Sequence, residues 1–595
     1  MGTATQEQQR VADNMSQNGM VIALPGSGKS FTMKQGVKNI LVLNRGARIA
    51  MVTFTRAATD ALKVSLEGML DKQKFSRCQI NTFHGFINQQ AREAGFKGTV
   101  LIGNKQNAII RRSIKNTGSQ ADIKEASQMI DAIGRELNPA TISSKFNQSQ
   151  IGLYNEYLAL CRKDNAADYN ALSRLVLVAM KKGSITPLKV DYLVVDEVQD
   201  TDSVQFSWIV EHTKRGIVTN IVGDDDQTIY SFRNAGGVKI FRQFEELFRP
   251  NVYYLTSCFR CAPEILRAAE TVIKFNESRY DKAMNAARND TGKVVFHASA
   301  DLQSQIHLAV SLIEAEPEGW AVLCRNNNHL DELEGELKTP VMRIGGASFW
   351  DSEHPNELLS FFTFLRHPND EKLLVRTLAL LDEEEDVIDM IVQQVKYRVP
   401  FHSQTLPTNC QLQTVNLHAS MRDWSCDTRE RGVIRMRFAA LANWLQMAGH
   451  TIKNRAGTDN ALGAALKHCM KWAEKEGWLK MLNVCAGILQ GNQKKNEVYD
   501  PSKVVLATLH GSKGLEWKKV IIISVNHDQI PSKKVVGVEG LEEERRLLYV
   551  GMTRAEIELH LIWYGNSSPF LTQAFEKEVS DASHNVFVHE DKEEQ

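Results

Sequence analysis

Short apolar runs that end in polar loops mark several stretches of the chain. The runs at 20–23 (MVIA), 192–195 (YLVV) and 221–223 (IVG) are each followed by a loop that is rich in glycine or in acidic residues. Short apolar runs that end in turns are typical of parallel strands covered by helices on both faces. They predict an α/β fold.

Two long stretches instead have apolar residues at helical spacing. One is 87–186, which contains ADIKEASQMIDAIGREL and IGLYNEYLALCRK, and the other is 366–499, which contains GVIRMRFAALANWLQMA. Apolar positions that recur every three or four residues indicate amphipathic helices. We therefore expect two mainly helical inserted domains within the α/β framework.

Length and composition fit a multidomain globular protein. The chain has 595 residues, 43% of them hydrophobic, whereas a single domain usually has about 100–200 residues. Lys and Arg together number 71, as do Asp and Glu, so any nucleic-acid site has to be a local basic groove. No signal-like start and no apolar run of about 18 residues is present. We expect a cytoplasmic protein with no membrane partner.

Nine cysteines are scattered along the chain, and we expect reduced thiols. Cys258 and Cys261 form a C-x-x-C pair without a second pair at zinc-site spacing. An iron–sulfur or zinc site is the alternative, and the irregular gaps between its four candidate ligands disfavour it. These ligands are Cys410, Cys426, Cys469 and Cys485.

The segment ALPGSGKS, at 23–30, follows an apolar run and opens a polar helix, as a phosphate-binding loop does. Its glycines let backbone N–H groups close around phosphate oxygens, Lys29 reaches the terminal phosphates, and Ser30 offers a hydroxyl to Mg²⁺. A glycine-rich turn with a chance lysine is the alternative. The loop predicts ATP and Mg²⁺ as cofactors, with nucleotide contacts from Ala23, Leu24, Pro25, Gly26, Ser27, Gly28, Lys29 and Ser30.

The pair Asp196 and Glu197 follows the apolar run YLVV, as residues at the carboxyl end of a buried parallel strand do. In an NTPase, Asp196 would hold Mg²⁺, and Glu197 would orient and deprotonate the water that attacks the γ-phosphate. An acidic pair on a surface loop is the alternative, but it leaves the preceding apolar run unexplained.

The segment IVGDDDQTIYSFRNA ends with two aromatic residues, Tyr230 and Phe232, beside Arg233. In an extended segment the two rings share a face, and bases of a single strand stack on such rings. Gln227 lies a few residues earlier, where it would touch the γ-phosphate. A core strand with two buried aromatics is the alternative for this segment taken alone.

With this motif the chain resembles the superfamily 1 DNA helicases of the UvrD/Rep/PcrA type, whose corresponding motif reads GDDDQ-x-IY-x-(F/W)R-x-A. The resemblance implies two RecA-like parallel-sheet motor domains with the two mainly helical insertions. It also implies that Gln8, in TQEQQRVA, contacts adenine.

Further motifs follow in the family's order. VTFTRAATDAL and INTFHGF are similar to segments that grip DNA in the first motor domain, although Arg56 stands where asparagine is usual. VVLATLHGSKGLEWKKVII is close to a motif of the second motor domain, where two residues would meet DNA and Glu516 would meet the ribose. The implied DNA contacts are Thr53, Phe54, Thr55, Arg56, Thr82, His84, Tyr230, Phe232, Arg233, His510 and Lys513.

Two motifs carry arginines that the resemblance assigns as arginine fingers. YLTSCFRCAPEIL has Arg260, with Phe259 in place of a tyrosine that stacks on adenine and Cys258 in place of an asparagine. EEERRLLYVGMTRAE has Arg554. The candidate catalytic residues are therefore Lys29, Glu197, Gln227, Arg260 and Arg554.

The order of the motifs implies the domain boundaries. The first motor domain would comprise 1–86 and 187–250, with its insertion at 87–186. The second would comprise 251–365 and 500–580, with its insertion at 366–499 and an acidic tail at 581–595.

The resemblance is incomplete in the second insertion. After RHPNDEKLLVRTLALL the family usually has a Gly-Ile-Gly element that touches duplex DNA, whereas this chain has DEEEDVIDM, at 382–390. A solvated helix face is the common explanation of such an acidic run. If the duplex contact is missing, strand separation would be weak or would need a partner.

These observations favour an ATP-dependent DNA helicase that moves 3′ to 5′ on single-stranded DNA and acts at junctions with duplex, as a monomer or weak dimer. The alternative is a DNA-stimulated ATPase subunit of a nuclease or repair complex with little unwinding of its own. A small-molecule P-loop kinase has no use for the paired arginines or the aromatic residues. RNA as the track stays open, because stacking rings accept either sugar.

Overall fold

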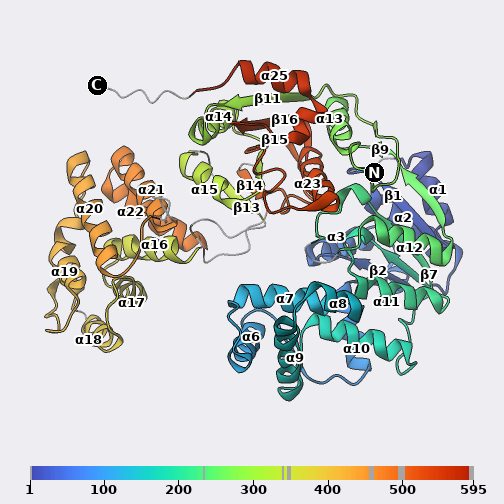
Figure 1. The fold of residues 1–595 in the computed structure, drawn as a ribbon, viewed down its shortest axis with the longest axis horizontal. Coiled ribbons are helices and arrows are strands. Elements are labelled where there is room, and N and C mark those ends of the chain that lie inside the picture. The colour runs from blue at the N-terminus through green and yellow to red at the C-terminus, as the bar shows by residue number, and fades with distance from the viewer. Residues whose placement is uncertain are drawn as a thin grey trace. The chain divides into compact units, whose positions relative to one another are not determined.

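The computed structural model describes residues 3–231, 235–337, 339, 341–344, 350, 352–397, 399–453, 461–492 and 503–588, with only the backbone at 104, 124, 335, 461 and 490–492. The chain divides into two compact units (Figure 1). Unit 1 comprises Met1–Gln305 and Ser512–Gln595, and unit 2 comprises Ile306–Gly511.

A six-stranded sheet organises unit 1, and every neighbouring pair of its strands is parallel. The strand order is β3-β2-β6-β7-β1-β8. The predicted strands at 20–23, 192–195 and 221–223 are all part of it. The strands are β1 (Gly19–Ala23), β2 (Ile49–Thr53), β3 (Cys78–Thr82), β6 (Tyr192–Val195), β7 (Val218–Gly223) and β8 (Asn251–Leu255).

Alternate residues of each central strand face two separate cores. In β1, Met20 and Ile22 pack into one core and Val21 and Ala23 into the other. Two-sided burial explains why these strands have continuous apolar runs instead of alternating polarity. The helices of this part are α1 (Gln6–Asn14), α2 (Lys29–Leu43), α3 (Arg56–Glu67), α4 (Lys72–Phe75), α5 (Phe83–Glu93), α11 (Ser203–Lys214) and α12 (Val238–Phe248).

The carboxyl ends of all six strands lie at one edge of the sheet, because the pairing is parallel throughout. The phosphate loop, the Asp196–Glu197 pair and the acidic run at 224–226 each follow one of these strands. The expected boundary at 250 falls just before β8, which pairs with β1 and so continues the first sheet.

Residues between β3 and β6 form mainly helices, drawn in teal and blue in Figure 1. They have a core of their own that includes Ile110, Ile130 and Tyr157. The pair of short strands β4 (Thr99–Val100) and β5 (Ala166–Ala167) was not expected from the helical pattern. The helices are α6 (Asn104–Thr117), α7 (Ile123–Arg135), α8 (Pro139–Lys145), α9 (Gln148–Lys163) and α10 (Tyr169–Lys181).

The rest of unit 1 contains three more parallel strands, in the order β11-β16-β15. They are β11 (Lys293–Ser299), β15 (Trp517–Ile522) and β16 (Ala555–Tyr564). Also present are β9 (Ser257–Cys258), β10 (Asn285–Ala286), α13 (Pro263–Ile273), α23 (Gly537–Met552), α24 (Pro569–Ala574) and α25 (Glu576–His584).

Unit 2 combines three parallel strands with a helical group. The strands are β12 (Trp320–Cys324), β13 (Val341–Ile344) and β14 (Val504–Thr508), with β14 in the middle. Most of α14 (Leu302–Ala315) and all of α15 (Asn327–Glu336) accompany them. The helical group is α16 (Glu353–Arg366), α17 (Glu371–Leu380), α18 (Glu385–Lys396), α19 (Leu412–Trp424), α20 (Arg431–Met447), α21 (Ala461–Glu476) and α22 (Trp478–Asn492).

The acidic run at 382–390 leads into α18, and its acidic residues are exposed except for Glu383, which is buried and accepts from the Gln411 N–H. Glu384 caps the helix and Glu385 and Asp386 occupy its first turn, where carboxylates are favourable beside the positive end of the helix dipole. Val387 and Ile388 are buried in the helical core. Apart from Glu383, the acidic residues of the run therefore form a solvated helix face, as the composition suggested.

All nine cysteines are free thiols. The sulfurs of Cys469 and Cys485 lie 3.9 Å apart, yet within the described ranges the only close group of three metal-ligating side chains is Asp224, Asp225 and Asp226. The alternative of a four-cysteine metal site therefore has no support. None of the described helices is long and apolar enough to span a bilayer.

Candidate active site

The phosphate loop connects β1 to α2 and depends on two glycines with positive φ, 64° at Gly26 and 79° at Gly28. A Cβ at Gly26 would lie 2.5 Å from the Cβ of Arg260, and one at Gly28 would lie 2.6 Å from Nε2 of Gln8. That Nε2 donates to the Ser27 carbonyl at 3.1 Å. No side chain caps the start of α2, so its N-terminus keeps the dipole and the amide groups that favour an anion.

Lys29, the first residue of α2, lies beside the acidic pair that follows β6. Its Nζ is 3.2 Å from Oε1 of Glu197, which itself has a φ of 49°. Burial alone would raise the pKa of Glu197, but Lys29 and Lys513 outweigh it and hold the pKa at about 2. Glu197 is thus held as an ionised carboxylate beside Lys29.

The neighbouring carboxyl behaves differently. Burial and the charge of Glu197 raise the pKa of Asp196 to about 7. A divalent cation would favour ionised Asp196 and replace its proton. Asp196 follows β6 and Ser30 is in the first turn of α2, and their oxygen donors are the kind that Mg²⁺ prefers. This donor set fits the ion.

Gln227 ends a short 3₁₀ turn, η2 (Asp225–Gln227), after β7. Its Nε2 donates to Oδ2 of Asp224 at 2.7 Å, and its Oε1 accepts from Nη2 of Arg554 at 3.5 Å. Two of the predicted catalytic residues, 327 positions apart in the sequence, are therefore in contact.

Arg554 is 1% exposed and follows α23. Its guanidinium donates to neutral acceptors, which include the carbonyls of Val550 at 2.9 Å and Leu515 at 3.0 Å. Burial and the charge of Arg260 lower the pKa of Arg554 to about 9. A buried cation with neutral partners is stabilised by an incoming anion such as a phosphate.

Arg260 lies over the phosphate loop, because the N–H of Phe259 donates to the Gly26 carbonyl at 2.9 Å. Its guanidinium is paired with the carboxylate of Glu516. The ring of Phe259 is 43% exposed, which leaves a face for stacking.

Lys513, an expected DNA contact, is 8% exposed and occupied by protein groups. Its Nζ donates to both carboxylate oxygens of Asp200 and to the Gln227 carbonyl, each at 2.7 Å. The same ammonium lies 5.0 Å from the ring centre of Tyr230. Lys513 thus connects the residues around Gln227 to an aromatic residue expected to touch DNA.

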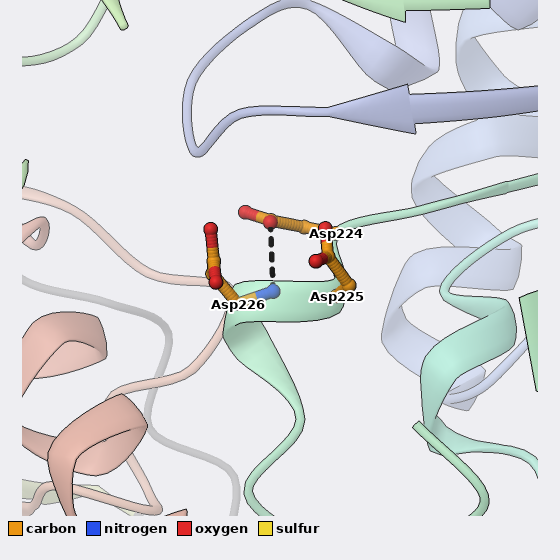
Figure 2. A group of neighbouring side chains, drawn as sticks. All are labelled: Asp224, Asp225 and Asp226. Carbon is orange, nitrogen blue, oxygen red and sulfur yellow. Dashed lines mark hydrogen bonds between the residues drawn. The ribbon is translucent and has the colours of Figure 1, made fainter. Parts of the chain in front are cut away.

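Three buried carboxylates converge where η2 begins, as Figure 2 shows for Asp224, Asp225 and Asp226. The ammonium of Lys282 pairs with all three, and Arg279 pairs with Asp226. Sequence reasoning missed Lys282 and Arg279. Three consecutive aspartates after a buried strand indicate that cations lie nearby, but no neighbouring residue in the sequence indicates which ones.

Several expected DNA contacts line one cleft of about 440 Å³ in unit 1. Phe54, Arg56, Thr82 and His84 all border it, and so does Tyr169, which sequence reasoning missed. The Tyr169 and His84 rings stack with centroids 4.3 Å apart.

His84 contributes to this cleft as a neutral ring. Burial and the charge of Arg135 lower its pKa to about 4. A neutral ring binds DNA by stacking or hydrogen bonding instead of by charge.

The other expected contacts are placed less directly. Thr53 is buried against Thr59, with their hydroxyls 2.6 Å apart, and Thr55 caps α3. The Tyr230 ring is nearly parallel to that of Phe54, with centroids 6.2 Å apart. His510 follows β14 in unit 2. Phe232 and Arg233 lie outside the described residues.

A parallel sheet with a phosphate loop after one strand and an acidic pair after another defines a P-loop NTPase. A model of the UvrD/REP helicase N-terminal domain matches residues 4–249, and one of the UvrD-like helicase C-terminal domain matches 253–399 and 422–566. The chain therefore belongs to the UvrD-like helicase family, as its motifs indicated.

Similar proteins include helicases from bacteria and yeast. The "ATP-dependent DNA helicase Rep" of Buchnera aphidicola is 24% identical over 91% of this chain and 90% of its own length. The "ATP-dependent DNA helicase PcrA" of Bacillus subtilis is 23% identical, with coverages of 91% and 80%. The "ATP-dependent DNA helicase srs2" of Schizosaccharomyces pombe is also 23% identical, with coverages of 91% and 69%.

Proposed function

We propose that this UvrD-like, ATP-dependent DNA helicase moves 3′ to 5′ along single-stranded DNA and unwinds duplex at junctions. The observation that carries the proposal is the contact between Gln227 and Arg554 beside Lys29 and Glu197. It joins a glutamine placed to reach a γ-phosphate with a buried guanidinium that has neutral partners. The direction of movement rests on the family resemblance alone.

The proposed roles in hydrolysis follow from the charges. Glu197 is the general base, because it is ionised and lies next to Lys29 at the end of β6. Lys29, Arg260 and Arg554 stabilise the charge on the transferring phosphoryl group, and Gln227 contacts the γ-phosphate. Ser30 and Asp196 would hold Mg²⁺, which supplies charge neutralisation when bound.

Nucleotide selectivity would come from the residues around the loop. Gln8 would contact adenine, Phe259 would stack on the base and Glu516 would meet the ribose. The polar groups of Gln8 and Glu516 are already paired within the protein. The Gln8 amide donates to the Ser27 carbonyl, and the Glu516 carboxylate pairs with Arg260. Binding of ATP would have to replace these contacts with contacts to the nucleotide. In its absence, the Glu516 carboxylate would hold Arg260 near the loop.

DNA would bind in the cleft lined by Phe54, Arg56, Thr82, His84 and Tyr169. Its rings offer stacking surfaces, and Arg56 offers a charge to the phosphate backbone. Tyr230 would connect this surface to hydrolysis. Its ring lies nearly parallel to that of Phe54, which lines the cleft, and Lys513 contacts both Tyr230 and the Gln227 carbonyl. The domain boundaries, given above, stay predictions.

A second candidate is a DNA-stimulated ATPase subunit of a nuclease or repair complex that unwinds little by itself. The acidic start of α18, which stands where the family has its Gly-Ile-Gly element, favours it. Carboxylates repel phosphates, so this surface does not suit duplex DNA.

The test measures ATP hydrolysis by the purified chain with and without single-stranded DNA, and then displacement of a labelled strand from 3′-tailed and 5′-tailed duplexes. A Glu197→Gln variant controls for contaminating ATPases. Stimulated hydrolysis with displacement of the 3′-tailed substrate alone supports the helicase. Stimulation without displacement favours the subunit, displacement of the 5′-tailed substrate contradicts the direction, and no stimulation contradicts both candidates.

A further inference from the structure

We propose that Lys282 is a positioning residue for hydrolysis, which holds Asp224 so that Gln227 faces Arg554. The inference deepens the proposed function and rests on the role of Gln227 in it. Neither Lys282 nor its partner Arg279 belongs to a motif that pointed to nucleotide chemistry.

Lys282 is the cation of the acidic cluster. Its side chain is 1% exposed, and its Nζ lies 3.0 Å from Oδ1 of Asp224 and 2.9 Å from Oδ2 of Asp226, with Asp225 also in contact. The three side chains lie close together at the start of η2, as Figure 2 shows, with one carboxylate oxygen of each within 4.8 Å of the others. An ammonium fills the place that a metal ion would take, so the cluster is an ion-pair network and not a metal site.

The charges of the cluster nearly balance. Arg279 binds Asp226 through Nε at 3.0 Å and Nη2 at 2.8 Å. Burial raises the pKa of Asp225, whose carboxyl accepts from the Tyr280 N–H at 2.7 Å. Two cations thus face three carboxyl groups, of which Asp225 has a raised pKa and Asp226 a lowered one. Removing either cation leaves a buried negative charge, which is costly.

A single carboxylate joins Lys282 to Gln227. Oδ1 of Asp224 accepts from Lys282, while Oδ2 accepts from Nε2 of Gln227 at 2.7 Å. With its amide nitrogen held in this way, Gln227 presents Oε1 to Arg554. Without the ammonium, Asp224 would lose the partner that holds its Oδ1, and the glutamine would lose its fixed orientation.

The segment that carries Lys282 is also tied to α23, the helix that leads to Arg554. Oε1 of Glu542 accepts from the N–H groups of Glu277 at 2.6 Å and Ser278 at 3.0 Å. Nη2 of Arg546 donates to the Ser278 carbonyl at 2.7 Å. Residues 276–282 therefore contact both α23, which leads to Arg554, and the carboxylate that holds Gln227. A shift of α23 would for this reason change the position of Gln227.

The experiment is a double-mutant cycle in the full-length chain. Lys282→Met keeps the apolar stem and removes the charge, Gln227→Ala removes the positioned group, and the double variant combines them. For each, kcat and KM for ATP are measured with saturating single-stranded DNA. We expect Lys282→Met to lower kcat about 10- to 100-fold, the worth of a hydrogen bond to a charged group, with KM for ATP little changed. Adding it to Gln227→Ala should lower kcat no further.

A merely structural lysine would give a different pattern. The effects of the two substitutions on kcat would then multiply, and KM for ATP would change with them, whereas a loss of thermal stability is expected in either case because a buried charge loses its partner. Lys282→Arg restores the charge and should recover part of the kcat. If Lys282→Met does not fold, Lys282→Met with Asp226→Asn keeps the cluster's formal charge and replaces it in the cycle. Multiplying effects in either cycle overturn the inference.

Measurements on the wild-type chain distinguish a failure of the proposed function from a failure of the role of Lys282. If it shows no DNA-stimulated hydrolysis, the proposed function fails before Lys282 is tested. If it is stimulated and the cycle is additive, the proposed function stands and the role of Lys282 is wrong.

Discussion

Individual residues at the carboxyl edge of the first sheet have charges set by their neighbours more than by their type. Glu197 and Asp196 are adjacent in the sequence, yet the pKa of one is held at about 2 and that of the other is raised to about 7. The difference arises because Lys29 and Lys513 act on Glu197, whereas burial dominates at Asp196. These charges suit the proposed roles, a base at Glu197 and a cation ligand at Asp196 that must first lose a proton.

Lys29→Ala should abolish ATP turnover. The substitution removes the cation at the phosphate loop and leaves Glu197 without its 3.2 Å partner. Loss of a phosphate-stabilising cation is worth several orders of magnitude in rate. A steady-state ATPase assay checks this, with Lys38→Ala, further along α2, as the control. Turnover of Lys29→Ala near the wild-type level would show that the loop does not bind phosphate.

His212 should make the protein less stable in mild acid. The Leu188 N–H donates to its Nε2 at 3.2 Å, so Nδ1 carries the proton and donates to the Trp208 carbonyl at 2.7 Å. Burial lowers the pKa of His212 to about 4, from an unfolded value of about 6.5. The stabilisation is complete above about pH 6.5 and is lost as the pH falls towards 4, with roughly 2 kcal/mol gone at pH 5.

Urea unfolding at pH 7 and pH 5 measures this loss. His212→Gln has no titrating group, so its unfolding free energy should fall less between the two pH values. The exposed His584, substituted in the same way, is the matched control. An equal fall in wild type and His212→Gln would contradict the assignment.

At the scale of elements, the two helices α5 and α10 join the sheet edge to the helical insertion. Thr82 ends β3 and caps α5 by accepting the Gly85 N–H at 3.2 Å, which sets where His84 points. Tyr169 is the first residue of α10 and stacks on His84. The cleft proposed to bind DNA is thus lined by two helix starts that are far apart in the chain.

Tyr169→Ala should weaken binding of single-stranded DNA. A ring that stacks a base contributes about 1–3 kcal/mol, which corresponds to about 5- to 150-fold in Kd. Fluorescence anisotropy with a labelled oligonucleotide measures the change. Tyr397→Ala removes a tyrosine that is 82% exposed in unit 2 and serves as the control. Equal affinities of the two variants would remove Tyr169 from the DNA site.

At the scale of the whole molecule, the balanced charge gives no general attraction to DNA, since 71 basic residues face 71 acidic ones. Binding therefore depends on local grooves, and a local acidic surface weakens it. The start of α18 is such a surface, with Glu384, Glu385 and Asp386 all exposed.

Replacing Glu384 and Glu385 by Gln should speed displacement of a tailed duplex and leave movement on bare single-stranded DNA unchanged. The reason is that fewer carboxylates would repel the phosphates of the duplex. Strand displacement and release of streptavidin from a biotinylated single strand measure the two activities. Glu371→Gln, at the start of α17, is the control. Efficient unwinding by the wild type, unaltered in the variant, would rule out any cost from the acidic run.

Local patterns in the sequence determined the phosphate loop, the acidic pair after YLVV, the helical insertions and the family. The phosphate loop and the acidic pair are each complete within about 20 consecutive residues, where strand, turn and helix signals are adjacent, and the insertions and the family follow from repeated local patterns of this kind along the chain. The β4–β5 pair escaped because strands of two residues have no readable period.

Only the tertiary structure decided which groups meet at the sheet edge. Lys282 pairs with Asp224 across 58 residues, and Lys513 with Asp200 across 313. The strand order β3-β2-β6-β7-β1-β8 brings the segments with Asp200 and Asp224, which follow β6 and β7, to one edge of the sheet, whereas Lys282 and Lys513 come from segments outside this sheet. An acidic run after an apolar strand indicates that a cation must lie nearby, because burial makes an unpaired charge costly. Which cation it is depends on the packing of the whole unit.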